Sequence, residues 1–294
     1  MPGDRTSFHR RLVSRRVQAL RQIESWPVSF AAAGVVTGDG RFETRGDARR
    51  AVRLASVSKP VAALAVLVAA EEGVVDLDEA AGPPGSTVRH LLAHASGLPF
   101  EGSESIAPPG KRRIYSNEAF RVLGAHLALR AEMQFADYVR AGVCEPLGID
   151  LDPEGDPASG MHGSLEDVLV FAGELLAPRL VAQETLDEMR AAQFPGLSGV
   201  LPDYGRFDPL DWGLGVQLNT RPATWMGTRT SARTFGHFGG SGTFLWVDPE
   251  AGVACAVLTD RGFDEWAKEA WPMLSDAVVG ELEAQATPGN HRST

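Results

Sequence analysis

The spacing of apolar residues predicts strands towards both ends of the chain. Residues 28–36 and 41–45 have strand-like apolar patterns on either side of a Gly-Asp-Gly sequence at 38–40. Glycine and aspartate tolerate the left-handed backbone of tight turns, so this segment predicts an antiparallel hairpin. Strand patterns return in the last third of the chain, over residues 212–218, 233–237, 243–247 and 253–259, and a final helix is predicted over residues 263–283.

Helical spacing dominates between these strand-rich parts. Residues 56–72 predict a strong helix, because Pro60 suits a first turn, apolar residues follow at helical intervals and Gly73 ends the pattern. Near the start, apolar positions from Phe8 to Ile23 with arginines between them predict an amphipathic helix. Further helices are predicted over residues 88–94, 117–130, 134–143, 164–176 and 183–193.

This order of elements predicts an α/β (α+β) fold in which the two ends of the chain build one sheet. We expect an antiparallel sheet, flanked by N- and C-terminal helices, in a domain made of residues 1–84 and 206–294. Residues 85–205 are expected to form an inserted all-helical domain. Ligands commonly bind in clefts between domains, so the functional site is expected where the two domains meet.

Composition and charge narrow the class of partner. The 294 residues are 44% apolar, which supports a substantial core, and they carry a formal net charge of -10. Nucleic acid or an anionic membrane would require a basic field, so we expect a small-molecule substrate and neither of those partners. Residues 1–30 lack the apolar stretch of an export signal, and no segment is long and apolar enough to span a membrane. These patterns predict a soluble, cytoplasmic protein, and none of them specifies an oligomeric state.

The cysteines and two of the histidines favour structural roles. Cys144 and Cys255 lie in apolar contexts, which predicts buried thiols rather than a disulfide. His90 and His94 are four residues apart, as metal ligands on a helix can be, but no third ligand is evident in the sequence. We therefore expect no metal and no other cofactor.

Lysine is rare in this chain, and one lysine follows a serine at helical spacing. Only Lys59, Lys111 and Lys268 occur, against 25 arginines, and Ser56 precedes Lys59 by three residues. On a helix this spacing places both side chains on one face, where a desolvated, neutral lysine can take the proton of a serine hydroxyl. A helix-capping serine followed by a surface lysine would give the same pattern. Ser58 is the rival hydroxyl, but its side chain is expected on a different face.

Two further motifs offer groups that would complement such a pair. Tyr115 and Asn117 stand at the predicted start of a helix, where a tyrosine can relay protons and an asparagine can contact a substrate amide or ester. Asn117 is equally well explained as the helix N-cap. Residues 236–242, Gly-His-Phe-Gly-Gly-Ser-Gly, allow close approach of backbone N-H groups to a ligand, although a hairpin with a bulge would also explain the glycines.

Together and in this order, the three motifs resemble those of the serine β-lactamase and penicillin-binding-protein family. The resemblance is greatest to the class C branch, which also contains D,D-peptidases and family VIII carboxylesterases. It extends beyond the motifs, over residues 54–78, 87–99 and 244–259. The resemblance implies a β-lactamase-like fold and a serine hydrolase that works through an acyl-enzyme.

The resemblance also implies a role for each motif residue. Ser56 would be the nucleophile, Lys59 its proton acceptor and Tyr115 a second general acid or base. The substrate would be bound by Asn117, His237 and Gly239, and the backbone N-H groups of Ser56 and Gly240 would form the oxyanion hole.

The third motif departs from much of the family. His237 stands where many class C β-lactamases have lysine and family VIII esterases often have tryptophan, while D,D-peptidase-like members commonly use histidine. A histidine can anchor a substrate carboxylate when it is protonated, but at neutral pH it is largely uncharged unless a neighbour raises its pKa. The leading hypothesis is a carboxylesterase acting on a small ester. The alternatives are a β-lactamase or D,D-peptidase-like amidase, acting on a lactam or amide, and a binding protein that does not turn over.

Overall fold

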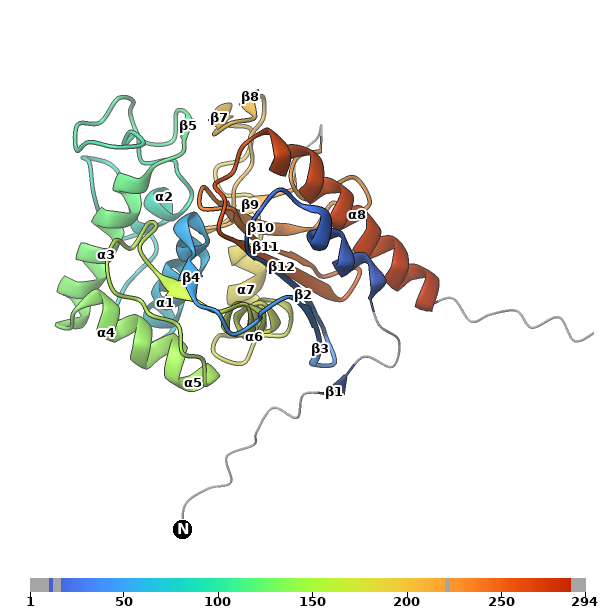
Figure 1. Cartoon of the computed structure of the whole chain (residues 1–294). Coiled ribbons are helices and arrows are strands. Elements are labelled where there is room, and N and C mark those ends of the chain that lie inside the picture. Colours follow the sequence, from blue (N-terminus) through green and yellow to red (C-terminus); the bar gives the residue numbers. More distant parts are fainter. Residues whose placement is uncertain (1–10, 13–16, 220–222, 287–294) are drawn as a thin grey trace, which may run out of the picture.

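The computed structural model describes residues 11–12, 17–219 and 223–286 (Figure 1). Over these residues, seven strands form the main sheet in the order β1-β3-β2-β12-β11-β10-β9. Its pairs are antiparallel except for β1 with β3. The strands of this sheet are β1 (Arg11–Leu12), β2 (Ala31–Thr37), β3 (Arg41–Arg45), β9 (Gln217–Leu218), β10 (Phe235–Gly239), β11 (Thr243–Asp248) and β12 (Val253–Thr259).

The two ends of the chain meet at the centre of the sheet. Strand β2 pairs with β12 along its whole length, from Ala31 opposite Thr259 to Thr37 opposite Val253. Both strands are almost continuously apolar, which suits strands covered on both faces. The expectation that the N- and C-terminal parts build one antiparallel sheet is therefore confirmed.

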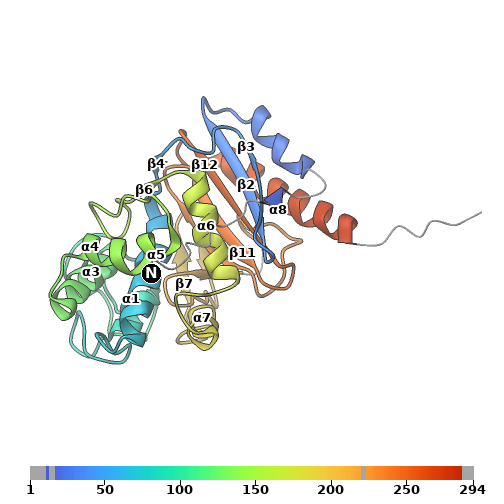
Figure 2. The same cartoon turned by 90° about the horizontal axis from the view of Figure 1, so that it is seen from below.

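Helices cover both faces of the sheet, and alternate residues of its central strands serve the two faces (Figure 2). Val253, Cys255 and Val257 of β12 share a core with α8 (Glu265–Ala286) and the 3-10 helix η1 (Gln18–Ser25). Ala254, Ala256 and Leu258 share a second core with α6 (Leu165–Leu176). This alternation is the period-two pattern of an extended strand.

Helix α1 (Ser58–Glu71) lies in the second core, where it packs against α3 (Asn117–Ala131), α4 (Phe135–Val139) and strand β10. Its residues from Ser58 to Ala69 are all buried, which is the pattern of a helix packed on every side. Gly73 follows the helix with φ of +73°, where glycine carries no steric cost. The other helices are η2 (Ala55–Val57), α2 (Val88–Leu92), α3 (Asn117–Ala131), α4 (Phe135–Val139), the π-helical turn η3 (Arg140–Cys144), α5 (Glu145–Leu147) and α7 (Gln183–Met189).

Several elements differ from the sequence predictions. The helix predicted near the start of the chain is wrong at residues 11–12, which form a strand. Residues 18–25 form the short 3-10 helix η1. The other positions of the predicted helix before residue 17 lie outside the described residues. In the strand predicted over residues 212–218, only the last two are extended. Short paired strands were not predicted, namely β4 (Val52–Arg53) with β6 (His162–Gly163), and β5 (Arg113–Ile114), β7 (Gly199–Leu201) and β8 (Gly205–Phe207).

Helix α6 bears on the predicted division into domains. It falls within the segment 85–205 that was assigned to the helical domain, yet it packs against strands β2, β11 and β12 of the sheet. An apolar helix face beside an apolar sheet explains this, because burial and not chain order decides where a helix packs. The domain limits stay a prediction. No helix in the described part of the chain is long and apolar enough to cross a membrane.

Candidate active site

Ser56 lies in the tight 3-10 turn that leads into helix α1. The turn is η2, and α1 begins two residues later at Ser58, so the serine precedes the helix rather than lying within it. Ala55 has φ of +46°, a left-handed conformation that costs energy in a residue other than glycine. The neighbouring Leu54 fixes the turn, since its N-H donates to Met161 O at 2.9 Å and its carbonyl accepts from Thr243 Oγ1 at 2.8 Å.

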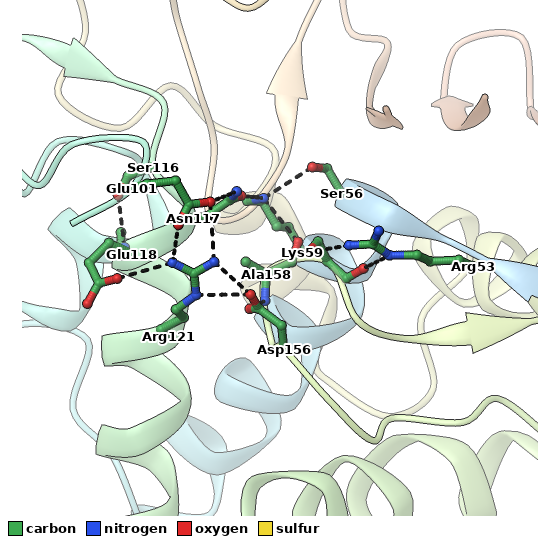
Figure 3. Close-up of polar contacts among 12 residues, drawn as sticks. Arg53, Ser56, Lys59, Glu101, Ser116, Asn117, Glu118, Arg121, Asp156 and Ala158 are labelled. Atoms are coloured by element: carbon green, nitrogen blue, oxygen red, sulfur yellow. Dashed lines mark hydrogen bonds and ion pairs between the residues drawn. The ribbon is translucent and has the colours of Figure 1, made fainter. Parts of the chain in front are cut away.

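The Lys59 side chain is fully buried and points back towards Ser56 (Figure 3). Its Nζ lies 3.2 Å from Ser56 Oγ, 2.7 Å from Asn117 Oδ1 and 3.0 Å from Ala158 O. Burial lowers the pKa of Lys59 to about 7, because water no longer solvates the ammonium. Near neutral pH a large fraction of this amine is therefore uncharged and can accept a proton. The surface-lysine explanation of the motif is wrong.

Tyr115 completes the group around the serine. Its hydroxyl donates to Ser56 Oγ over 2.7 Å, and Lys59 Nζ lies 4.8 Å from the centre of its ring. Burial raises the pKa of Tyr115 above its ordinary value, so the phenol remains protonated at neutral pH. The contacts permit a directed chain in which Tyr115 donates to Ser56 and Ser56 donates to a neutral Lys59.

Asn117 is the first residue of α3, but it is not the helix cap. Ser116 takes that place, with its Oγ accepting from Ala119 N at 2.9 Å, so the capping explanation of Asn117 is wrong. The buried Asn117 amide instead accepts from Lys59 and donates from Nδ2 to Glu101 Oε1 at 2.9 Å. It therefore links the lysine to the loop that precedes α3.

His237 enters the site from strand β10 and is only 2% exposed. Its Nδ1 lies 2.7 Å from Phe238 O, which only a protonated nitrogen can approach favourably, so Nδ1 carries the hydrogen. Burial, together with the charge of Lys59, lowers the pKa of His237 to about 3. The ring is neutral at working pH, and Nε2 is a buried acceptor with no hydrogen-bond partner among the described residues.

A second buried histidine, His94, packs against the ring of Tyr115. His94 Nδ1 accepts from the Ser116 N-H at 3.1 Å, and the His94 ring lies 4.7 Å from the rings of both Tyr115 and Trp212. Burial keeps the pKa of His94 well below its ordinary value. The structural role expected for His94 agrees with these contacts, and the described residues include no group of three or more side chains placed to hold a metal ion.

Gly239 and Gly240 of the third motif have different surroundings. A Cβ on Gly239 would lie 2.5 Å from Leu54 O and 2.4 Å from Thr243 Oγ1, so the strand approaches the turn before Ser56 too closely for a side chain. Gly240 is exposed, and a Cβ there would meet nothing within 4 Å. Gly239 thus fixes the position of β10 beside the turn that holds Ser56, while the oxyanion role of Gly240 stays a prediction.

Comparison with known proteins agrees with this arrangement. The sequence matches the family model named Beta-lactamase over residues 24–150 and 149–278. The chain belongs to the β-lactamase family. The family comprises serine hydrolases of one fold, including esterases and acyltransferases, that act on small esters, amides or lactams. The resemblance of the sequence motifs to this family is therefore confirmed.

Three similar proteins show how far the likeness extends. The crystal structure of a β-lactamase from Mycobacterium bovis is 48% identical, with a TM-score of 0.89, over 90% of this chain and 99% of that one. EstCE1, described as a hydrolase with promiscuous acyltransferase activity, shares the fold at 20% identity, with a TM-score of 0.73 over 90% and 98% of the two chains. Penicillin-binding protein 4* of Bacillus subtilis is 27% identical over 130 residues, which are 33% of this chain and 29% of that protein.

The structure adds residues to the site of this β-lactamase-family chain that the motifs did not reveal. Ala158 O accepts from Lys59, Glu101 accepts from Asn117, and Arg121 contacts Glu101. These partners lie in loops or further along a helix, and nothing in the local sequence marks them. Arg121 follows Asn117 by four residues on α3, which is the only spacing signal among them.

Proposed function

We propose that this protein is a carboxylesterase that hydrolyses small, uncharged esters through an acyl-enzyme on Ser56. The observation that carries the proposal is the contact set of Ser56 Oγ, with Lys59 Nζ at 3.2 Å and the Tyr115 hydroxyl at 2.7 Å. A base and an acid thus share one hydroxyl, which is the requirement for activating it as a nucleophile.

In the acylation step, Lys59 Nζ accepts the proton of Ser56 Oγ as that oxygen bonds to the ester carbonyl carbon. The carbonyl electron pair moves to its oxygen, which the backbone N-H groups of Ser56 and Gly240 stabilise. When the pair returns, the bond to the leaving oxygen breaks. The proton held by Lys59 then reaches the leaving alkoxide through the Tyr115 hydroxyl, which releases an alcohol and leaves the acyl group on Ser56.

Deacylation uses the same groups in the reverse direction. A water oxygen bonds to the acyl carbon while its proton passes through Tyr115 to Lys59. Collapse of the tetrahedral intermediate breaks the bond to Ser56 Oγ, and Lys59 returns the proton to that oxygen. Because the pKa of Tyr115 is raised, the phenol acts as a relay that stays protonated between steps, and the neutral lysine is the resting base.

The state of His237 favours an uncharged substrate. Penicillins and peptide C-termini carry a carboxylate, which a cation at the third motif would attract. A ring whose pKa is about 3 supplies no positive charge there, and its bare Nε2 offers an acceptor instead. Esters also require less protonation of the leaving group than amides do.

Hydrolysis of β-lactams is the second candidate. It is favoured by the Mycobacterium bovis protein named as a β-lactamase, which is 48% identical along nearly its full length. The two candidates share the acylation step and differ in the substrate group that would contact His237. They are therefore separated by substrate preference and not by the loss of catalytic residues.

The test is a matched panel of chromogenic substrates. We expect p-nitrophenyl butyrate to give a burst and turnover, and to exceed the carboxylate-bearing p-nitrophenyl hydrogen succinate in kcat/KM by about tenfold. Ser56→Ala should lower turnover by at least ~10³-fold. Ser58→Ala, the matched control, should retain it, since the Ser58 Oγ instead accepts from Met161 N at 3.2 Å. Turnover of a chromogenic cephalosporin above that of both esters would favour the β-lactamase, and undiminished ester turnover in Ser56→Ala would refute both candidates.

A further inference from the structure

Besides Ser56 Oγ, Lys59 Nζ has two oxygen partners among the described residues, which come from different parts of the chain, and each is itself held by a carboxylate. Asn117 Oδ1 is placed by the hydrogen bond from its Nδ2 to Glu101 Oε1 at 2.9 Å. Ala158 O is placed through its own residue, because Ala158 N donates to Asp156 Oδ1 at 2.8 Å. Two carboxylates on separate loops therefore fix the acceptors of the candidate base.

Arg121 joins these two carboxylates (Figure 3). Its Nε donates to Asp156 Oδ2 at 2.9 Å, and its Nη1 contacts Glu101 Oε2. Nη1 also lies 3.2 Å from Glu118 Oε2, one turn earlier on α3. The contacts close a ring that runs from Lys59 through Asn117, Glu101, Arg121, Asp156 and Ala158 back to Lys59.

We propose that Arg121 is a positioning residue, which orders both oxygen partners of Lys59 so that the amine is directed at Ser56. This inference rests on the proposed role of Lys59 as the base. Arg121 reaches neither Ser56 nor Lys59 through any of its hydrogen bonds, so it acts through Asn117 and Ala158. Without the guanidinium, Glu101 and Asp156 repel each other, and the two acceptors lose their common support.

The charges around Lys59 make this role measurable. The other titratable groups near the amine are Tyr115, whose ring lies 4.8 Å from Lys59 Nζ, and the histidines His94 and His237, and the direction of each pKa shift keeps these rings neutral near pH 7. The charged groups that act on Lys59 are Asp156, Glu101 and Arg121, which belong to the closed set of contacts described above. The carboxylates of Asp156 and Glu101 raise the pKa of Lys59 and Arg121 lowers it, while Glu118 is paired with Arg121.

A purely stabilising ion-pair cluster is the plain alternative. The Arg121 side chain is 35% exposed and its carboxylate partners are also partly solvated, so its ion pairs contribute little to folding stability. A stabilising role would change the thermal midpoint and lower the activity equally at every pH. A positioning role instead moves the pH at which Lys59 becomes a base.

The experiment measures the rate at which a fluorophosphonate probe labels Ser56 between pH 5 and 10. The probe reports activation of the hydroxyl without requiring the natural substrate. Arg121→Gln should slow labelling at pH 7 by about tenfold and move the midpoint of its pH dependence upward by about one unit, because two unopposed carboxylates favour the ammonium. Glu101→Gln removes a negative charge, so its midpoint should move downward. Arg121→Lys should restore part of the rate and most of the midpoint.

Arg140→Gln is the matched control, since Arg140 also joins two carboxylates, Asp137 and Glu154, at the protein surface. It should label like the wild type. Equal midpoints in the wild type and in folded Arg121→Gln and Glu101→Gln variants, or shifts of the same sign, would overturn the role of Arg121. Failure of the wild type itself to be labelled at Ser56 would instead overturn the proposed function, so the two failures are distinguishable.

Discussion

At the scale of the residue, burial without a carboxylate partner determines the chemistry of Lys59. A lysine in water would be charged throughout the physiological range, and a partner carboxylate would keep it so. Among the described residues, the amine forms hydrogen bonds only with a hydroxyl, an amide oxygen and a backbone carbonyl. Its neutral form therefore becomes accessible near pH 7, where a base is needed.

The lowered pKa of Lys59 predicts how activity depends on pH. Lys59 accepts a proton only when it is unprotonated, so ester kcat/KM should rise with pH and reach half of its plateau near pH 7. Lys59→Arg should lower the plateau by at least ~10³-fold with no recovery up to pH 9, because arginine stays charged. The exposed Lys111 offers the same change as a control, and Lys111→Arg should follow the wild-type curve. A flat wild-type profile between pH 5 and 9 would argue against a lysine base.

At the scale of the element, the site depends on how closely strand β10 approaches the turn that holds Ser56. Gly239→Ala would place a methyl group 2.5 Å from Leu54 O, so we expect it to cost about 1–3 kcal/mol of stability and to lower ester turnover sharply. Gly240→Ala has open space, and it should fold and melt like the wild type. Thermal unfolding and turnover of both variants provide the check, and equal behaviour of the two would contradict this account of β10.

The elements also show what the sequence could and could not predict. The helix after Ser56 and strands β2, β3, β11 and β12 were predicted because their apolar patterns are long and periodic. The segment 212–218 was predicted as a strand, but only Gln217–Leu218 forms one, and Trp212 makes isolated bridges with Gln193 and Gln217. Its apolar residues are buried by tertiary contacts, and a local pattern cannot distinguish that burial from a strand.

Part of the candidate site was predictable from the sequence, namely the residues that stand in short motifs. Ser56, Lys59, Tyr115 and Asn117 stand in short motifs at spacings that their chemistry requires, and the structure brings them together. The tautomer of His237 was not predictable, because it depends on the carbonyl next to its ring and on complete burial. Arg121 and its partners were missed because the contacts join loops that are distant in the sequence.

At the scale of the whole molecule, one buried arginine forms hydrogen bonds with segments on both sides of the predicted domain limit at residue 205. The Arg113 guanidinium, on strand β5, donates to four backbone carbonyls, and no carboxylate in the described part of the chain forms a hydrogen bond with it. Arg113 is 2% exposed, so these hydrogen bonds replace water around its guanidinium. The acceptors are the carbonyl groups of Ala93, Gln193, Phe194 and Leu210.

Removing this arginine should therefore loosen the molecule as a whole. Arg113→Met keeps much of the volume but leaves three buried acceptors and one partly buried acceptor, Phe194 O, without their donor, each worth about 1 kcal/mol, so we expect the melting temperature to fall by about 5–10 °C. The exposed Arg140→Met should change it by no more than about 1 °C. Calorimetry checks both variants, and an unchanged transition in Arg113→Met would show that the carbonyl contacts contribute little.

Ser56, activated by a neutral Lys59, should form a covalent acyl-enzyme. The most direct test mixes the protein with p-nitrophenyl butyrate at pH 7, quenches it in acid within milliseconds and maps the adduct by mass spectrometry. We predict one butyryl group on Ser56 in the wild type, the same adduct in Ser58→Ala, and none in Ser56→Ala or Lys59→Arg. A butyryl group on another residue, or full ester turnover by a Ser56→Ala protein that carries no adduct, would contradict the account.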